Sequence, residues 1–229
     1  MKKSAITIAM IISIMIFTSC KINEQKFNGV KVEYSGALRT IMSGNIESVI
    51  SLDSLKNKES LFALGAIGGL KGEIQIFYGK SSNSIVKDST LQILDSYDLE
   101  ASLLVYSEVK KWQTFQIENS NTKDHLEEQI YQLAQTIGLD INKPFPFILD
   151  GKVSLLHWHV INWKDSDTIH NHKKHKESGL SGTLQNEKVE IIGFYSTKHK
   201  AIFTHHSTNM HMHFKTDDNT IAGHVDNLI

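Results

Sequence analysis

This 229-residue chain has one cysteine, two prolines and a formal net charge of only −1, and these low values limit what kind of protein it can be. A single cysteine, Cys20, cannot close an internal disulfide, so the fold is not a disulfide scaffold. The 24 basic side chains nearly balance the 25 acidic ones, which gives no electrostatic reason to expect a nucleic-acid partner. Neither a Gly-rich phosphate loop nor a hydrolase nucleophile elbow occurs in the sequence. Both prolines fall within residues 143–147, and we expect a joint in the chain near 142–147.

The N-terminus has the pattern of an export signal. Two lysines precede an apolar run, residues 6–17, that is too short to span a bilayer comfortably. The run ends at Phe17-Thr18-Ser19-Cys20, which resembles a lipobox and predicts cleavage before Cys20 and lipidation of its thiol. An ordinary secretory signal with an incidental cysteine is the alternative. We therefore expect an exported protein of the cell envelope that touches the membrane only through its lipid anchor. Its expected parts are a signal peptide at 1–19, a tether at 20–29 and one domain at 30–229.

Short alternating apolar segments dominate the rest of the chain, and one amphipathic helix stands out. Apolar residues from Leu126 to Ile137 recur at helical spacing between a capping residue, Thr122 or Asn121, and Gly138. Strand-like runs lie on both sides of this helix and are most frequent after residue 182. The pattern predicts an α+β fold of two packed β-sheets, mixed or antiparallel, with one main helix.

The strongest functional signal is a set of three histidines near the C-terminus. His211 and His213 alternate in a predicted strand, so their side chains point to the same face. Turn-forming residues at 215–220 follow, and a hairpin there would bring His224 beside the other two. Three imidazoles without a cysteine are the ligand set of a catalytic zinc that keeps open coordination positions. The alternative is a histidine-rich strand pair whose rings simply hydrogen-bond.

Two further groups of histidines precede this hairpin. The polar segment 165–178 contains three of them interleaved with lysines, whose charge repels cations. We therefore expect a solvated loop there rather than a metal chelator; its histidines are His170, His172 and His175. His205 and His206 are adjacent, and neighbouring residues of a strand face opposite ways, so at most one of them can face the site.

Several motifs, taken in order, resemble the α-acetolactate decarboxylase family over about residues 38–228. The first runs from Gly65-Ala66 to Gly72-Glu73-Ile74 and Gly79, and the second is the run from Phe147 to Gly151. The third is the most specific and is similar in order and spacing to the family's zinc-binding hairpin. It consists of Gly193-Phe194-Tyr195, His211-Met212-His213-Phe214, Asp217-Asp218 and Gly223-His224-Val225.

The resemblance implies a two-sheet subunit in which His211, His213 and His224 hold zinc or another divalent transition metal, and it suggests a homodimer. Glu73 matches a glutamate that faces the metal in the family; a surface carboxylate on a strand is the alternative. The family reaction converts 2-acetolactate, a 2-hydroxy-3-keto acid, to acetoin and carbon dioxide. Such a reaction requires a Lewis acid to stabilise the electrons left by carbon dioxide and an acid to deliver a proton.

The chain departs from the family pattern at two places. The family carries an arginine about eight residues after an Asp-Gly turn, and counting from Gly151 places His159 there. His159 lacks the permanent charge of arginine. It could be a fourth metal ligand or a proton donor, or else a half-buried histidine on an aromatic strand face. The family also supplies a second catalytic glutamate after the Gly-His-Val element. This chain has only Asp226 there, which lies too near His224 in sequence to be its equivalent.

We therefore expect a zinc-dependent lyase of the acetolactate decarboxylase type, with Glu73 and His159 as its catalytic side chains and a small 2-hydroxy-3-keto acid as its substrate. The two departures motivate an alternative, a non-catalytic envelope lipoprotein that keeps the metal in order to bind a small keto or hydroxy acid.

Overall fold

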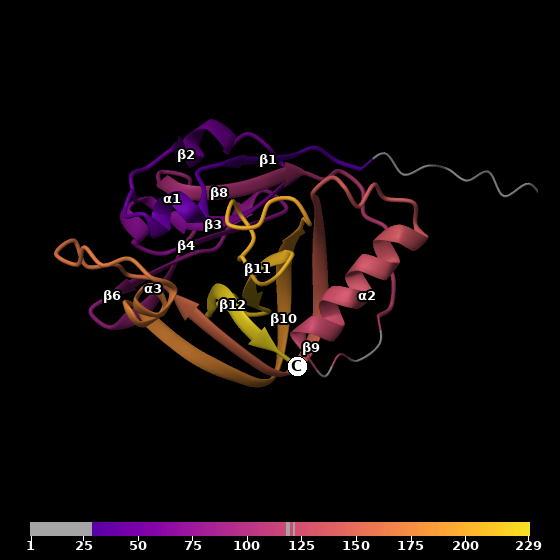
Figure 1. The fold of residues 1–229 in the computed structure, drawn as a ribbon. Helices are drawn as coiled ribbons and strands as arrows, with labels where there is room; N and C mark the ends of the chain where they lie inside the picture. The colour runs from indigo at the N-terminus through magenta and orange to yellow at the C-terminus, as the bar shows by residue number, and fades with distance from the viewer. Residues whose placement is uncertain (1–28, 118–119, 121) are drawn as a thin grey trace, which may run out of the picture.

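Two layers of β-strands with one long helix beside them make up the described part of the chain (Figure 1). The computed structural model describes residues 29–117, 120 and 122–229. The expected signal peptide, Cys20 and the tether up to residue 28 lie outside this range, so lipidation stays a prediction. Within the described residues, no helix is both long enough and apolar enough to cross a membrane.

The first sheet comes from the N-terminal half of the chain and is antiparallel. Its strands follow the order β1-β8-β3-β4-β6-β7, with β2 beside β8 and β5 beside β4. Their bounds are β1 Val32–Ser35, β2 Ile50–Ser51, β3 Leu61–Ile67, β4 Glu73–Phe77, β5 Lys80–Ser81, β6 Asn83–Lys87, β7 Thr90–Leu94 and β8 Glu100–Glu108. Both faces of β3 are buried. Phe62 and Leu64 pack toward the second sheet, whereas Leu61 and Ala63 pack with Leu52 on the other face.

The second sheet comes from the C-terminal half and closes on itself in the order β10-β11-β12-β9. Its strands are β9 Phe145–Val160, β10 Leu180–Tyr195, β11 Met210–Thr216 and β12 Ala222–Leu228. β9 and β10 form a long antiparallel hairpin along nearly their whole length, and the short hairpin β11–β12 closes the gap between its two arms. The prediction of two packed sheets is therefore confirmed in its antiparallel form. The closure of the second sheet into a small barrel was not expected.

The predicted main helix is α2, Lys123–Thr136, which packs against the barrel (Figure 1). Thr122 caps it, because its hydroxyl oxygen accepts a hydrogen bond of 3.1 Å from the backbone N–H of His125. Leu126 and Ile130 bury the apolar face in the core of the barrel. Shorter helical segments are α1 Leu38–Met42, α3 His172–Glu177 and the 3-10 turns Leu52–Leu55 and Gly68–Leu70.

The segment 165–178 is only in part the solvated loop that the sequence predicts, because residues 165–171 are a largely exposed loop whereas residues 172–177 are helical. It contains α3, which begins where the Asn171 side chain accepts a hydrogen bond of 2.9 Å from the backbone N–H of Lys174. His175 of this helix is buried against Trp163 and lies 2.9 Å from His170 between ring nitrogens. Local charge patterning could not predict this because the helix is fixed by packing of His175 onto Trp163, which lies outside the lysine-rich run 173–176 in the sequence.

The two sheets contact each other where β3 faces β10 and where β4 faces β11 and β12. Alternation along β4 sends Ile74 and Ile76 to the far face of the first sheet, where they join an apolar cluster. The intervening residues Glu73 and Gln75 point the opposite way, toward His213 of the barrel. The contact between the sheets therefore contains a buried polar layer, and the predicted site residues lie in it.

Candidate metal centre

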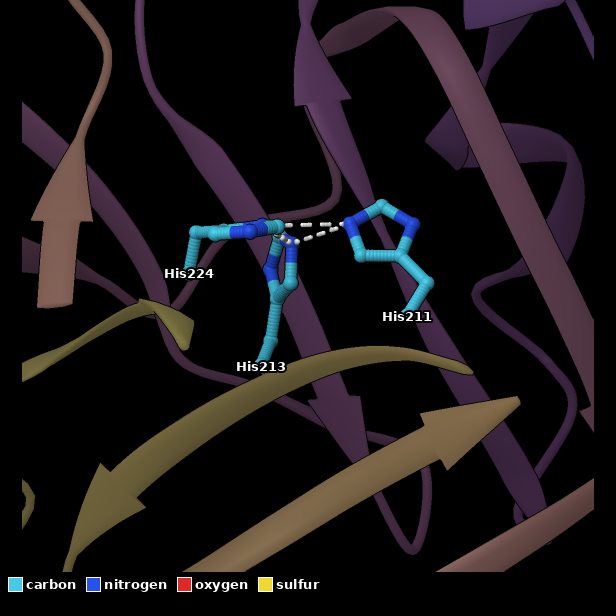
Figure 2. A group of neighbouring side chains, drawn as sticks. All are labelled: His211, His213 and His224. Carbon is cyan, nitrogen blue, oxygen red and sulfur yellow. Dashed lines mark hydrogen bonds between the residues drawn. The ribbon is translucent and has the colours of Figure 1, made fainter. Parts of the chain in front are cut away.

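The three predicted histidines converge on one point (Figure 2). His211 and His213 share a face of β11, and strand pairing places His213 directly opposite His224 on β12. The Nε2 atoms of His211 and His213 are 3.2 Å apart, and Nδ1 of His224 lies 3.2 Å from the first and 3.4 Å from the second. Three ring nitrogens from two strands thus form a compact triangle.

The surroundings of two of these rings fix which nitrogen carries the proton. Nδ1 of His211 donates to the backbone carbonyl of Phe203 over 2.8 Å, and Nδ1 of His213 donates to Oε1 of Gln75 over 3.2 Å. The amide nitrogen of Gln75 donates in turn to the Ser82 carbonyl and the Ser84 hydroxyl, which holds Oε1 toward the ring. Both Nε2 atoms are therefore left with lone pairs that face into the triangle.

Burial keeps all three rings neutral. It lowers the pKa of His211 to about 3 and holds the pKa values of His213 and His224 well below their ordinary range, with nearby positive charges adding to the effect. A neutral imidazole is the form that binds a metal ion. Zinc–nitrogen bonds of about 2.0–2.1 Å in tetrahedral arrangement separate two ligand nitrogens by about 3.3 Å. The spacing and the inward lone pairs therefore fit a small divalent cation such as zinc.

Glu73 lies beside this triangle at the start of β4. Its Oε2 atom is 3.8 Å from Nε2 of His213, and its Oε1 atom accepts a hydrogen bond of 3.2 Å from the backbone N–H of Ile161. Its side chain is 6 % exposed, which excludes the alternative of a surface carboxylate. Burial raises the pKa of Glu73 well above its usual range, although the bond from Ile161 opposes the rise. The glycine before it, Gly72, lets the chain pass so close to β6 that a Cβ would lie 2.3 Å from the Ser84 carbonyl oxygen.

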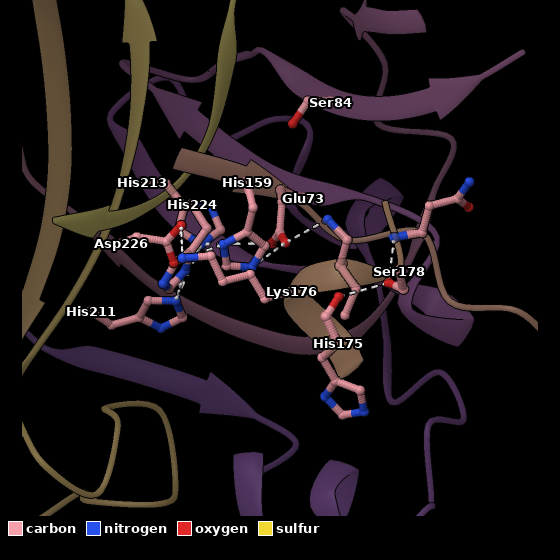
Figure 3. A network of polar contacts seen from close by, with 12 residues as sticks. Glu73, Ser84, His159, His175, Lys176, Ser178, His211, His213, His224 and Asp226 are labelled. Carbon is pink, nitrogen blue, oxygen red and sulfur yellow. Dashed lines mark hydrogen bonds and ion pairs between the residues drawn. The ribbon is translucent and has the colours of Figure 1, made fainter. Parts of the chain in front are cut away.

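His159 lies directly across the strand ladder from His224, on β9. Its Nδ1 atom is 3.0 Å from Oδ1 of Asp226, and its Nε2 atom points toward Oε1 of Glu73 at 3.9 Å. It is buried in this polar layer, so the alternative of a half-buried histidine on an aromatic face is wrong. The structure thus brings His159 and Glu73 together with the three histidines (Figure 3).

Asp226, which sequence reasoning set aside, belongs to the same cluster. It is the additional residue of a β-bulge in β12, between Val225 and Asn227, and bulges often redirect a side chain. Its two oxygens contact Nδ1 of His159 and, at 2.9 Å, the ammonium of Lys176. Burial favours a higher pKa for Asp226, but the bonds and charges of His159 and Lys176 outweigh it and lower the pKa. Asp226 is therefore an anion that holds His159 in place.

The other histidines lie outside the triangle. Within the described residues, only two groups bring three potential ligand atoms within 4.8 Å: His211–His213–His224 and His159–His224–Asp226. His175 belongs to the Trp163 cluster. His205 is half-buried beside His172, with ring centroids 4.7 Å apart, and His206 is exposed. Sequence reasoning also missed Gln75, although its place two residues after Glu73 on a strand already indicates the same face.

Comparison with known proteins agrees with this fold. The family model described as alpha-acetolactate decarboxylase matches residues 34–229. One similar solved structure is a protein of unknown function similar to alpha-acetolactate decarboxylase from Staphylococcus aureus. It has 18% identity and a TM-score of 0.69, covering 86% of this chain and 80% of that chain. No curated protein matches the chain.

Two further solved structures have the same overall architecture. One is alpha-acetolactate decarboxylase from Bacillus subtilis strain 168, with 15% identity and a TM-score of 0.71, covering 86% of this chain and 80% of that chain. The other is acetolactate decarboxylase from Bacillus subtilis subspecies spizizenii, with 16% identity and a TM-score of 0.71, covering 86% of this chain and 81% of that chain. At such identities the likeness establishes the fold.

Proposed function

Because the chain belongs to the alpha-acetolactate decarboxylase family, we propose that it is a zinc-dependent carboxy-lyase that converts 2-acetolactate into acetoin and carbon dioxide. In this proposal His211, His213 and His224 hold the metal, while Glu73 and His159 act on the substrate. The observation that carries it is the triangle of ring nitrogens 3.2–3.4 Å apart, two of which have their lone pairs directed inward by Phe203 and Gln75.

The bound metal would supply a Lewis acid that polarises the substrate's keto oxygen and stabilises the electron pair left on carbon when carbon dioxide departs. Glu73 would deliver a proton to that carbon, and its position 3.8 Å from Nε2 of His213 puts the carboxyl group beside the histidines that would hold the metal. Solvent restores the proton to Glu73 after acetoin leaves. His159 can pass this proton from solvent to Glu73 through Nε2, which points to Glu73 at 3.9 Å because Asp226 holds Nδ1.

A second candidate function is non-catalytic binding of a small keto or hydroxy acid at the same metal. It is favoured by His159, which stands where the resemblance calls for an arginine and offers no permanent charge. For either function we propose an exported protein that Cys20 anchors to the envelope by lipid and that works as a homodimer.

The decisive experiment measures acetoin formed from racemic 2-acetolactate by protein lacking residues 1–20, after loading with zinc. We expect turnover with zinc and none after chelation. Replacing both His211 and His213 with alanine should abolish zinc retention and turnover, whereas His206→Ala, at an exposed histidine, should change neither. Turnover that persists without metal contradicts the proposal. Firmly bound zinc without turnover supports the binding function instead.

A further inference from the structure

Two lysines reach the same aspartate at the edge of the metal centre. The ammonium of Lys176, from α3, lies 2.9 Å from Oδ2 of Asp226. The ammonium of Lys123, from the first turn of α2, donates to the backbone carbonyl of Asp226 over 3.4 Å. The three residues come from separate parts of the chain, so the fold itself brings two ammonium groups to Asp226, one to its carboxylate and one to its backbone carbonyl oxygen. Ligand atoms of His159, His224 and Asp226 lie within 4.8 Å of one another, so Asp226 borders the histidine triangle.

The ammonium of Lys123 has few hydrogen-bond partners among the described residues. Lys123 is half-buried, and among the described carboxylates none comes within 4.0 Å of its ammonium. Burial lowers the pKa of Lys123, while Asp226 and Glu127 pull the pKa upward through their charges. An ammonium has three donors, and the contact with Asp226 uses one of them at the long end of hydrogen bonding. The remaining donors can bind an anion that enters the site.

Lys176 is better paired but remains accessible. Its side chain is 40% exposed, whereas the side chain of its partner Asp226 is 11% exposed. Asp226 divides its two oxygens between Lys176 and His159, so it neutralises one of the two lysines at most. The Lys123 ammonium is thus left without an ion-pair partner within 4.0 Å among the described residues, although Glu127 and Asp124 act on it at longer range. A partly desolvated cation of this kind binds a carboxylate through charge-assisted hydrogen bonds.

We propose that Lys123 and Lys176 form an anion-binding rim that takes the carboxylate of a 2-hydroxy acid while its other oxygens face the histidine triangle. The rim provides the positive charge that His159 lacks at its own position. This inference rests on the proposed function and deepens it, since it names the residues that select an acid over an uncharged hydroxyketone or amide. Both lysines are binding and positioning residues; neither donates the proton to the product.

The test compares a charged ligand with an uncharged one of the same shape. The full chain, purified in a non-ionic detergent and loaded with Co²⁺, is titrated with 2-hydroxyisobutyrate and with 2-hydroxyisobutyramide while the visible absorption of the cobalt is followed. We expect the wild-type protein to prefer the carboxylate. Lys123→Met and Lys176→Met should each weaken carboxylate binding by about tenfold, while amide binding stays within about twofold.

Two controls separate charge from structure. Lys173→Met removes a lysine from the same helix whose side chain is 82% exposed, and it should leave both affinities unchanged. Lys176→Arg keeps the charge and should retain most of the preference for the carboxylate. The proposal of an anion-binding rim would be overturned if the methionine variants lost equal affinity for the acid and the amide. It would also be overturned if neither methionine variant lost affinity for the acid.

The outcome also distinguishes the rim from the proposed function. Failure of the wild-type protein to retain Co²⁺ would overturn both. Retained cobalt and selective carboxylate binding without conversion of 2-acetolactate would refute the lyase but support the rim. If 2-acetolactate is converted, Lys123→Met should raise KM about tenfold and leave kcat within about threefold, because a rim residue binds the substrate and does not react with it.

Discussion

Gln75 offers the sharpest test of how the metal centre is built. Its side chain is fully buried between the sheets, where Oε1 fixes the proton on Nδ1 of His213 and the amide nitrogen is held by Ser82 and Ser84. Gln75→Leu keeps the approximate volume but removes the acceptor. His213 can then place its proton on Nε2, the atom that faces the triangle.

These contacts determine how much metal affinity and how much stability Gln75→Leu should lose. Loss of a partner that orients a metal-binding histidine weakens metal affinity by about 10–100-fold, which is about 1.4–2.7 kcal/mol. The same substitution leaves buried acceptors unpaired at Ser82 and Ser84, so the metal-free protein should also lose about 1–3 kcal/mol of stability. The two effects are separable because one depends on the metal and the other does not.

The assay is competition for zinc between the protein and a chromophoric chelator, together with thermal unfolding of the metal-free form. Gln92→Leu is the matched control, since Gln92 is an exposed glutamine on β7 of the same sheet. We expect the control to match the wild-type protein in both measurements. Zinc affinity of Gln75→Leu within about twofold of wild type would refute the reasoning, even if its unfolding temperature fell.

Three further predictions concern other parts of the molecule. Glu73→Gln keeps an acceptor for Ile161 but cannot deliver a proton, so kcat should fall by about 10²–10⁴-fold while zinc is retained, as a metal assay would verify. Burial lowers the pKa of His175 from 6.5 to about 4. As the pH falls, the unfolded chain therefore binds the proton before the folded chain does. The contribution of neutral His175 to the free energy of unfolding is complete above pH 6.5 and is lost as the pH falls toward 4. His175→Gln should flatten that decline by up to about 1.4 kcal/mol per pH unit in denaturant titrations, and an unchanged slope would contradict the assignment. The unfolding temperature measured by calorimetry should rise with the concentration of free zinc and should fall when the zinc is chelated. In His211→Ala the unfolding temperature should not depend on zinc.

Those parts of the site that depend on local periodicity could be predicted from the sequence. His211 and His213 share a face because strand side chains alternate, and the turn before His224 indicates a hairpin. The helix after Thr122 was predictable for the same reason, since its cap and its apolar face are both local. The role proposed for Glu73 came from motif resemblance alone, and its burial beside His213 could be seen only in the structure.

The remaining contacts join residues that no local pattern connects. Asp226 enters the site through a β-bulge, and a bulge depends on the register with β9 rather than on the residues of β12. Lys176 reaches it from a six-residue helix, which is too short to be stable without tertiary packing and so is invisible to periodicity. The barrel likewise closes through pairing between β9 and β12, strands separated by most of the C-terminal half.

The long hairpin β9–β10 has a consequence for how this site can diversify. The three predicted metal-binding histidines lie on β11 and β12, whereas α3 lies in the connection between β9 and β10 and brings Lys176 to the site from outside. If the proposed rim selects the ligand, changes in the length or charge of that connection would alter which acids bind without disturbing the strands that hold the histidines. Surface connections tolerate such variation far better than core strands. Under the functions proposed above, ligand choice would depend in part on this surface connection and metal retention on core strands, so the two could be altered separately.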